Sequence, residues 1–72
     1  MEARHLHLLD RLIRESAVRV AEQKSRIERL ALRGHSTIAA EQALDVLKTR
    51  LQTFDGIRHA IEKTLRDIDA AK

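Results

Sequence analysis

Apolar residues in the first half of the chain recur three and four positions apart, the spacing of one face of an α-helix. This seam contains two polar interruptions and consists of Leu6, Leu9, Ile13, Ser16, Val20, Gln23, Ile27 and Leu30. A narrow stripe with this alternation is typical of helices that pair as coiled coils. We therefore predict a helix from about residue 3 to residue 33.

The second half of the chain repeats the alternation. Its seam consists of Ala40, Leu44, Leu47, Leu51, Phe54, Arg58, Ile61, Leu65 and Ile68. Gly56 lies inside this segment at a cost of roughly 1 kcal/mol relative to alanine, which is too little to break so periodic a helix. We predict a second helix from about residue 37 to residue 70.

A turn at residues 34–37 separates the two predicted helices. Gly34 can adopt the left-handed conformation that ends a helix, and Arg29 and Arg33 favour the negative end of the helix dipole. Ser36 or Thr37 can cap the next helix. A connection this short makes the helices antiparallel, so the sequence predicts an all-α fold in which residues 1–72 form a single coiled-coil-like hairpin.

The turn and its flanks resemble a group of short alphaproteobacterial hypothetical proteins built as helical hairpins. The resemblance rests on the segments 19–23 and 34–37 together with Ile27, Leu30, Ala40, Leu44 and Leu51. Members of that group commonly have Asp where this chain has Ser36, and an aromatic residue near the position of Leu47. The resemblance implies a helical hairpin and no activity.

Composition adds a constraint on stability. The chain has 72 residues, no cysteine and no proline, and Phe54 is its one aromatic residue. A chain this short buries little surface alone, and disulfides are unavailable to stabilise it, which leaves association as the simplest aid. The apolar run near the N-terminus is too short for a signal peptide or a membrane span. We expect a soluble, cytoplasmic protein that does not bind membranes.

Catalytic chemistry is not indicated by the sequence. A two-helix hairpin offers no deep pocket, and the chain contains no glycine-rich phosphate loop and no His-Glu-x-x-His motif. His5 and His7 are two positions apart, which places them on different sides of a helix and prevents them from chelating one ion. We expect a protein that is not an enzyme and that has neither a cofactor nor a metal site.

Positive charge is concentrated on the first half, where eight Lys and Arg residues outnumber five Asp and Glu. Arg19, Arg26 and Arg33 are seven residues apart on one flank, with Arg29 nearby. The simplest interpretation is a solvated face with local pairs such as Glu15 with Arg19 and Glu22 with Arg26. These four arginines are also candidates for contact with a protein partner or with phosphates. The nucleic-acid signal is weak because glutamates are interleaved and no exposed aromatic residue is available for stacking.

A second apolar line lies beside the seam. It consists of Ala39, Ala43, Val46, Ile57 and Ala60, with Leu8 and Leu12 on the matching flank of the first helix. A single hairpin would leave this line in water, and a second copy would bury it in a four-helix bundle. The sequence thus predicts a structural or protein-interaction module that self-associates as a dimer through Leu8, Leu12, Val46 and Ile57. The alternatives are a different protein partner on this surface and a nucleic-acid-binding regulator that uses the arginine flank.

Overall fold

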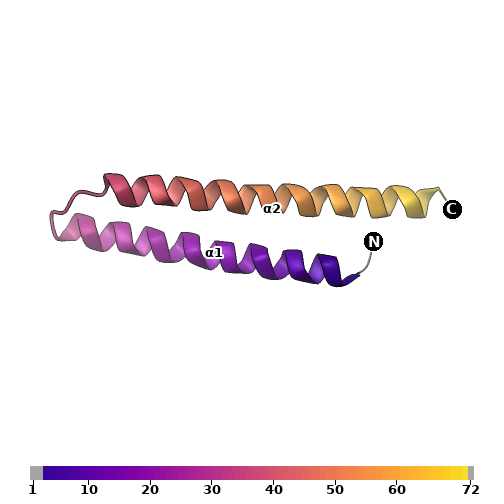
Figure 1. The fold of residues 1–72 in the computed structure, drawn as a ribbon, viewed down its shortest axis with the longest axis horizontal. Coiled ribbons are helices and arrows are strands. Elements are labelled where there is room, and N and C mark those ends of the chain that lie inside the picture. The colour runs from indigo at the N-terminus through magenta and orange to yellow at the C-terminus, as the bar shows by residue number, and fades with distance from the viewer. Residues whose placement is uncertain (1–2, 72) are drawn as a thin grey trace.

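A computed structural model describes the backbone of residues 3–71 and the side chains of residues 6–71. The chain forms helix α1 (Ala3–Leu32) and helix α2 (Ile38–Ala70), which lie side by side and run in opposite directions (Figure 1). The described residues contain no strand. The result is a rod with dimensions of 61 × 16 × 12 Å. The predicted all-α helical hairpin is confirmed.

The contact between the helices follows the predicted seam. The only described side chains that are buried are Val20, which is 8% exposed, and Ser16, which is 6% exposed. The other described seam residues are half-buried, with the exception of Ile68. Ile68 is exposed because α2 continues past the beginning of α1 (Figure 1). The hairpin therefore has a thin core, concentrated near the middle of α1.

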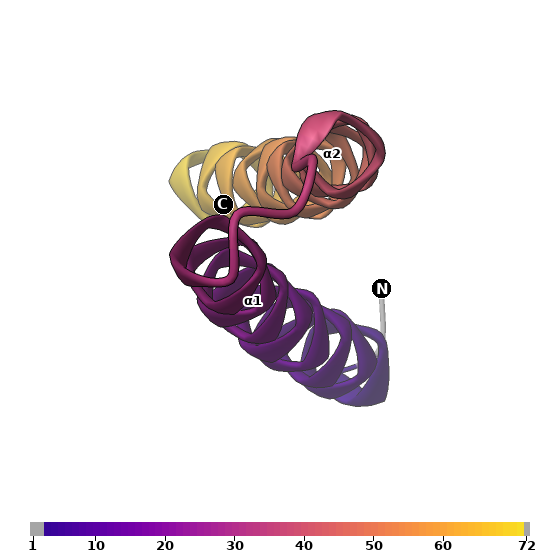
Figure 2. The ribbon, with the colours of Figure 1, turned by 90° about the vertical axis from the view of Figure 1, so that its left-hand side faces the viewer.

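The helices separate as they leave the turn. The view from the turn end shows them crossing at an angle, and they lie farther apart at the end that carries the termini (Figure 2). Near the turn, the Gln23 side chain crosses between them and its Nε2 donates a hydrogen bond of 2.8 Å to the Ala40 carbonyl. This polar seam residue thus links α1 to the backbone of α2 and restricts sliding of one helix along the other.

The end of α1 is a Schellman motif. Gly34 has φ of 72°, the His35 N–H donates to the Leu30 carbonyl at 2.9 Å, and the Gly34 N–H donates to the Ala31 carbonyl at 3.0 Å. These two bonds satisfy carbonyl groups that the helix itself leaves free. The left-handed conformation predicted for Gly34 is confirmed, and Arg29 lies in the last turn of α1.

Helix α2 begins without a strong side-chain cap. Thr37 occupies the N-cap position with φ of −106° and ψ of 1°, and its hydroxyl makes no capping hydrogen bond. This ψ is far from the extended values with which a capping side chain reaches the first turn. Ser36 Oγ instead lies 3.5 Å from the Ile38 N–H, at the long limit of a hydrogen bond. Of the two expected caps, Thr37 does not act as one and Ser36 contributes weakly.

The two glycines offer a paired test of the turn. A Cβ atom at either glycine would meet no atom within 4 Å, so crowding is absent at both positions. Gly34→Ala should nevertheless destabilise the protein by about 1 kcal/mol, because it forces a side chain into the left-handed region. Gly56→Ala should stabilise it by roughly 0.5–1 kcal/mol, because alanine is the better helix former. Chemical denaturation would measure both changes in the free energy of unfolding. If the two substitutions changed it in the same direction, the left-handed backbone of Gly34 would not be what disfavours a side chain there.

Candidate interaction surfaces

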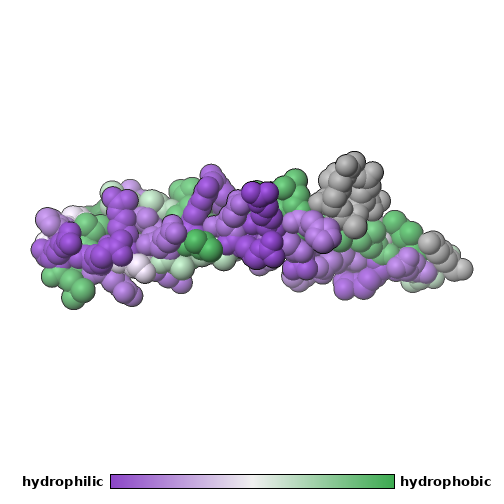
Figure 3. Space-filling model, turned by 90° about the horizontal axis from the view of Figure 1, so that it is seen from below, coloured by the Kyte–Doolittle hydropathy of each residue, from purple (hydrophilic) through white to green (hydrophobic). Residues whose placement is uncertain are grey.

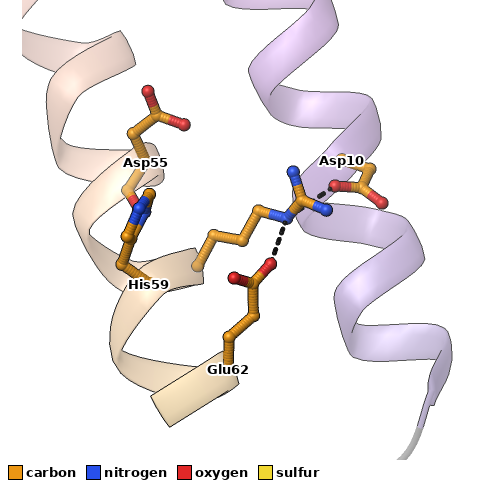
Figure 4. Close-up of polar contacts among 5 residues, drawn as sticks. Asp10, Asp55, His59 and Glu62 are labelled. Carbon is orange, nitrogen blue, oxygen red and sulfur yellow. Dashed lines mark hydrogen bonds and ion pairs between the residues drawn. The ribbon is translucent and has the colours of Figure 1, made fainter.

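An arginine at a seam position links the two helices at the open end. Arg58 Nε lies 3.1 Å from Asp10 Oδ1 on α1 and 3.0 Å from Glu62 Oε1 on α2 (Figure 4). Its N–H is aligned with neither oxygen well enough for a hydrogen bond, so both contacts are ion pairs. The head group of this seam residue therefore bridges the two helices.

The Arg58 bridge separates two carboxylates that the antiparallel arrangement brings to the same edge. Without the cation, Asp10 and Glu62 would repel each other across the seam. All three side chains are at least about a third exposed to solvent. Because solvent screens the charges, each ion pair contributes little to stability, on the order of 1 kcal/mol or less. The bridge therefore favours one pairing of the helices more than it adds stability.

The described histidines do not form a metal site. His59 Nδ1 lies 3.1 Å from the backbone oxygen of Asp55, one helical turn earlier, and because a carbonyl only accepts, Nδ1 carries the proton (Figure 4). His7 and His35 are exposed. The side chain of His5 lies outside the described residues. Among residues 6–71, no group of three or more potential ligands is close enough together to hold a metal ion.

The arginine flank is exposed along its whole length. None of Arg19, Arg26, Arg29 and Arg33 has a carboxylate within 4 Å among the side chains of residues 6–71. The expected pairs of Glu15 with Arg19 and of Glu22 with Arg26 are not formed. Glu15 instead contacts Arg11 Nε at 3.0 Å, in the previous turn. A glutamate on a helix has neighbours four residues away in both directions, and the preceding one is bound here.

Three of the four residues expected to mediate self-association are exposed. Leu8 is 54% exposed, Val46 is 61% exposed and Ile57 is 43% exposed. Leu12 differs from the expectation, because it is half-buried within the single hairpin. It lies three residues after Leu9 and four before Ser16, beside the seam, where α2 covers part of it. Its contribution to a second interface is therefore smaller than expected.

Other large apolar side chains are exposed outside the expected line. They are Val18, Leu32, Ile38 and Ile68. Leu32 and Ile38 flank the turn, and Val18 lies on the outer side of α1. On the face that Figure 3 shows, hydrophobic residues form separate patches among hydrophilic ones. The sequence placed Ile68 in the seam, whereas Val18, Leu32 and Ile38 fall outside both periodic lines, and single apolar residues of this kind are common on protein surfaces.

Two shallow grooves lie on the same side of the hairpin. The groove at the open end is mainly apolar and is lined by Ile57, Ala60, Ile61, Thr64, Leu65 and Ile68. The groove near the turn is lined by Gln23, Arg26, Leu30, Ser36, Ala39, Ala40 and Ala43. Neither groove brings together a nucleophile with a base or a pair of carboxylates. Their shape and lining suit contact with another helix.

No family model, curated protein or solved structure matches the chain. The resemblance to alphaproteobacterial hairpins therefore rests on its residues alone. Within the described part of the chain, neither helix is both long and apolar enough to cross a membrane. The surface of the described residues combines exposed apolar side chains with the exposed arginines of α1.

Proposed function

We propose that this protein is a non-enzymatic interaction module that self-associates through helix faces into a dimeric four-helix bundle. The observation that carries the proposal is the exposure of Leu8, Val46 and Ile57 in a hairpin that buries only two of its described side chains. A protein that folds as a single hairpin gains little from these apolar groups. A second copy would turn the same groups into a core.

The magnitudes support association. Full burial of one large aliphatic side chain contributes roughly 1.5–3 kcal/mol. Because the hairpin already buries about half of each of these side chains, Val46, Ile57 and Leu8 from two copies would together contribute on the order of 5–9 kcal/mol, compared with about 4–15 kcal/mol for the loss of translational and rotational freedom. The apolar groove at the open end extends the same surface through Ala60 and Thr64. Dimerisation is therefore within reach of the exposed apolar surface alone.

Sedimentation equilibrium tests the proposal directly. At tens of micromolar we expect a species of twice the 8.3 kDa chain mass. The melting temperature should also rise with protein concentration, because mass action favours the dimer. A single 8.3 kDa species with a constant melting temperature would overturn self-association. It would shift attention to a different protein that covers the same surface.

The exposed arginines support a second candidate function, regulation through nucleic-acid binding. A set of cations without nearby carboxylates is free to contact a phosphate backbone. In that case Arg26→Ala should weaken binding of duplex RNA and lower the slope of log affinity against log salt by about one. Fluorescence anisotropy with a labelled duplex measures this slope, and Lys63→Ala on α2 is the control. Absence of binding at low salt would eliminate this function.

A further inference from the structure

A stripe of eight residues runs along the exposed flank of α2 beside the seam. It consists of Ala39, Ala43, Val46, Arg50, Thr53, Ile57, Ala60 and Thr64, and every member is exposed. The stripe repeats the alternation of four and three residues and is about 38 Å long. We propose that a second copy of the chain packs on this stripe with its own α2 antiparallel, around a twofold axis between Arg50 and Thr53. This inference rests on the proposed self-association and specifies its geometry.

The order of residue sizes along the stripe carries the argument. An antiparallel match around this axis places Val46 opposite Ile57 of the other copy. It also places Ala43 opposite Ala60, and Ala39 opposite Thr64. Apart from the central Arg50 and Thr53, the stripe thus has a similar order of small and large side chains in both directions, as a twofold antiparallel pairing requires. Each pair joins one residue from the set 39, 46, 53 and 60 with one from the set 43, 50, 57 and 64, which are the two positions of the repeat. Antiparallel coiled coils pair the two positions of their repeat in the same manner.

The threonine hydroxyls of the stripe already donate hydrogen bonds within α2. Thr53 Oγ1 donates to the Thr49 carbonyl at 2.9 Å, and Thr64 Oγ1 donates to the Ala60 carbonyl at 2.9 Å. A hydroxyl that has its hydrogen bond within the helix can enter an apolar contact without leaving a donor unsatisfied. The stripe therefore presents one polar group that still needs solvent or a partner, the Arg50 guanidinium.

Charge favours the antiparallel orientation over the parallel one, because it separates the arginines near the two turns. In a parallel dimer each residue faces its own copy, so Arg50 would face Arg50 and the arginines near the two turns would lie together. In the antiparallel dimer Arg50 faces Thr53 and its head group reaches solvent at the rim. The turn of one copy, with Arg26, Arg29 and Arg33, then lies at the level of Arg66, Asp67 and Asp69 of the other. The two clusters of arginines near the turns are thereby at opposite ends of the dimer, while the two Arg50 residues lie on either side of the axis, about 4.5 Å apart along it.

Cysteine cross-linking tests the geometry, since the chain contains no cysteine. Val46→Cys and Ile57→Cys are prepared as separate variants, mixed, equilibrated and oxidised. The antiparallel dimer predicts a disulfide between the two different variants. Each variant alone should cross-link at least tenfold less, because two copies of residue 46 would be about 16 Å apart along the axis. A mixture of Lys48→Cys and Asp55→Cys is the control. These residues lie near the same height along α2 as residues 46 and 57 but on the opposite flank of the helix, so they should not cross-link.

The outcomes separate the geometry from self-association. Strong cross-linking of Val46→Cys with itself would show a parallel dimer and overturn the proposed geometry. So would a protein that sediments as a dimer but forms no disulfide between residues 46 and 57. Sedimentation of the unmodified chain as a monomer would instead contradict the proposed function, and the geometry with it.

Discussion

Val20→Asp is expected to leave the chain largely unfolded at room temperature. Val20 is one of two buried side chains among the described residues, and it faces the thin contact between the helices. A carboxylate there would lose its hydration without gaining a cation. We expect a loss of more than about 3 kcal/mol, which matches the total stability typical of so small a domain. Far-ultraviolet circular dichroism should show most of the helical signal lost.

Val18→Asp is the control for this substitution. Val18 has the same side chain two residues earlier, but it is 55% exposed on the outer side of α1. The change in helix propensity is the same in both variants, so a difference between them reports the seam alone. We expect Val18→Asp to retain its helical signal. Equal destabilisation by the two substitutions would show that α1 does not use this face against α2.

Ile57→Lys is expected to convert the dimer into monomers. Ile57 is exposed in the hairpin, lies on the stripe of α2 and lines the groove at the open end. Because Ile57 is 43% exposed in the hairpin, its substitution removes roughly 1 kcal/mol of apolar burial from each copy, and it places two ammonium groups in the interface. The melting temperature should fall by about 10 °C, since each kcal/mol shifts a domain of this size by roughly 4–8 °C.

Val18→Lys is the corresponding control for association, because it adds the same charge to an exposed apolar position on α1 away from the stripe. Sedimentation equilibrium should find this variant as a dimer and Ile57→Lys as a monomer that remains helical. If Ile57→Lys sedimented as a dimer at tens of micromolar, the exposed flank of α2 would not be the interface.

The fold was predictable from sequence because burial in a helical pair is periodic. The alternation of three and four residues identified the described seam residues, including the polar Ser16 and Gln23. The prediction that Ile68 is part of the contact was wrong because α2 extends beyond the beginning of α1. The end of α1 was predictable for a different reason, namely that Gly34 alone among its neighbours adopts a left-handed backbone without strain.

The polar contacts were not predictable in the same way. The Arg58 bridge to Asp10 depends on the distance between the helices at the open end. Glu15 has an arginine four residues away in each direction, Arg11 and Arg19, and the sequence does not determine that it contacts Arg11. The missing Thr37 cap depends on a backbone angle that no residue type dictates. Pattern identifies which face is buried, whereas these contacts depend on the path of the chain and on side-chain rotamers.

The distribution of contacts along the hairpin also sets an order of folding. The Schellman motif closes a loop of a few residues, and the hydrogen bond from Gln23 to Ala40 joins residues 17 apart in sequence. The Arg58 bridge to Asp10 closes a much longer loop, which costs more entropy. The half next to the turn should therefore be structured in the transition state, and the open end should form last. Substitutions near the turn would then slow folding, whereas those at the open end would mainly speed unfolding.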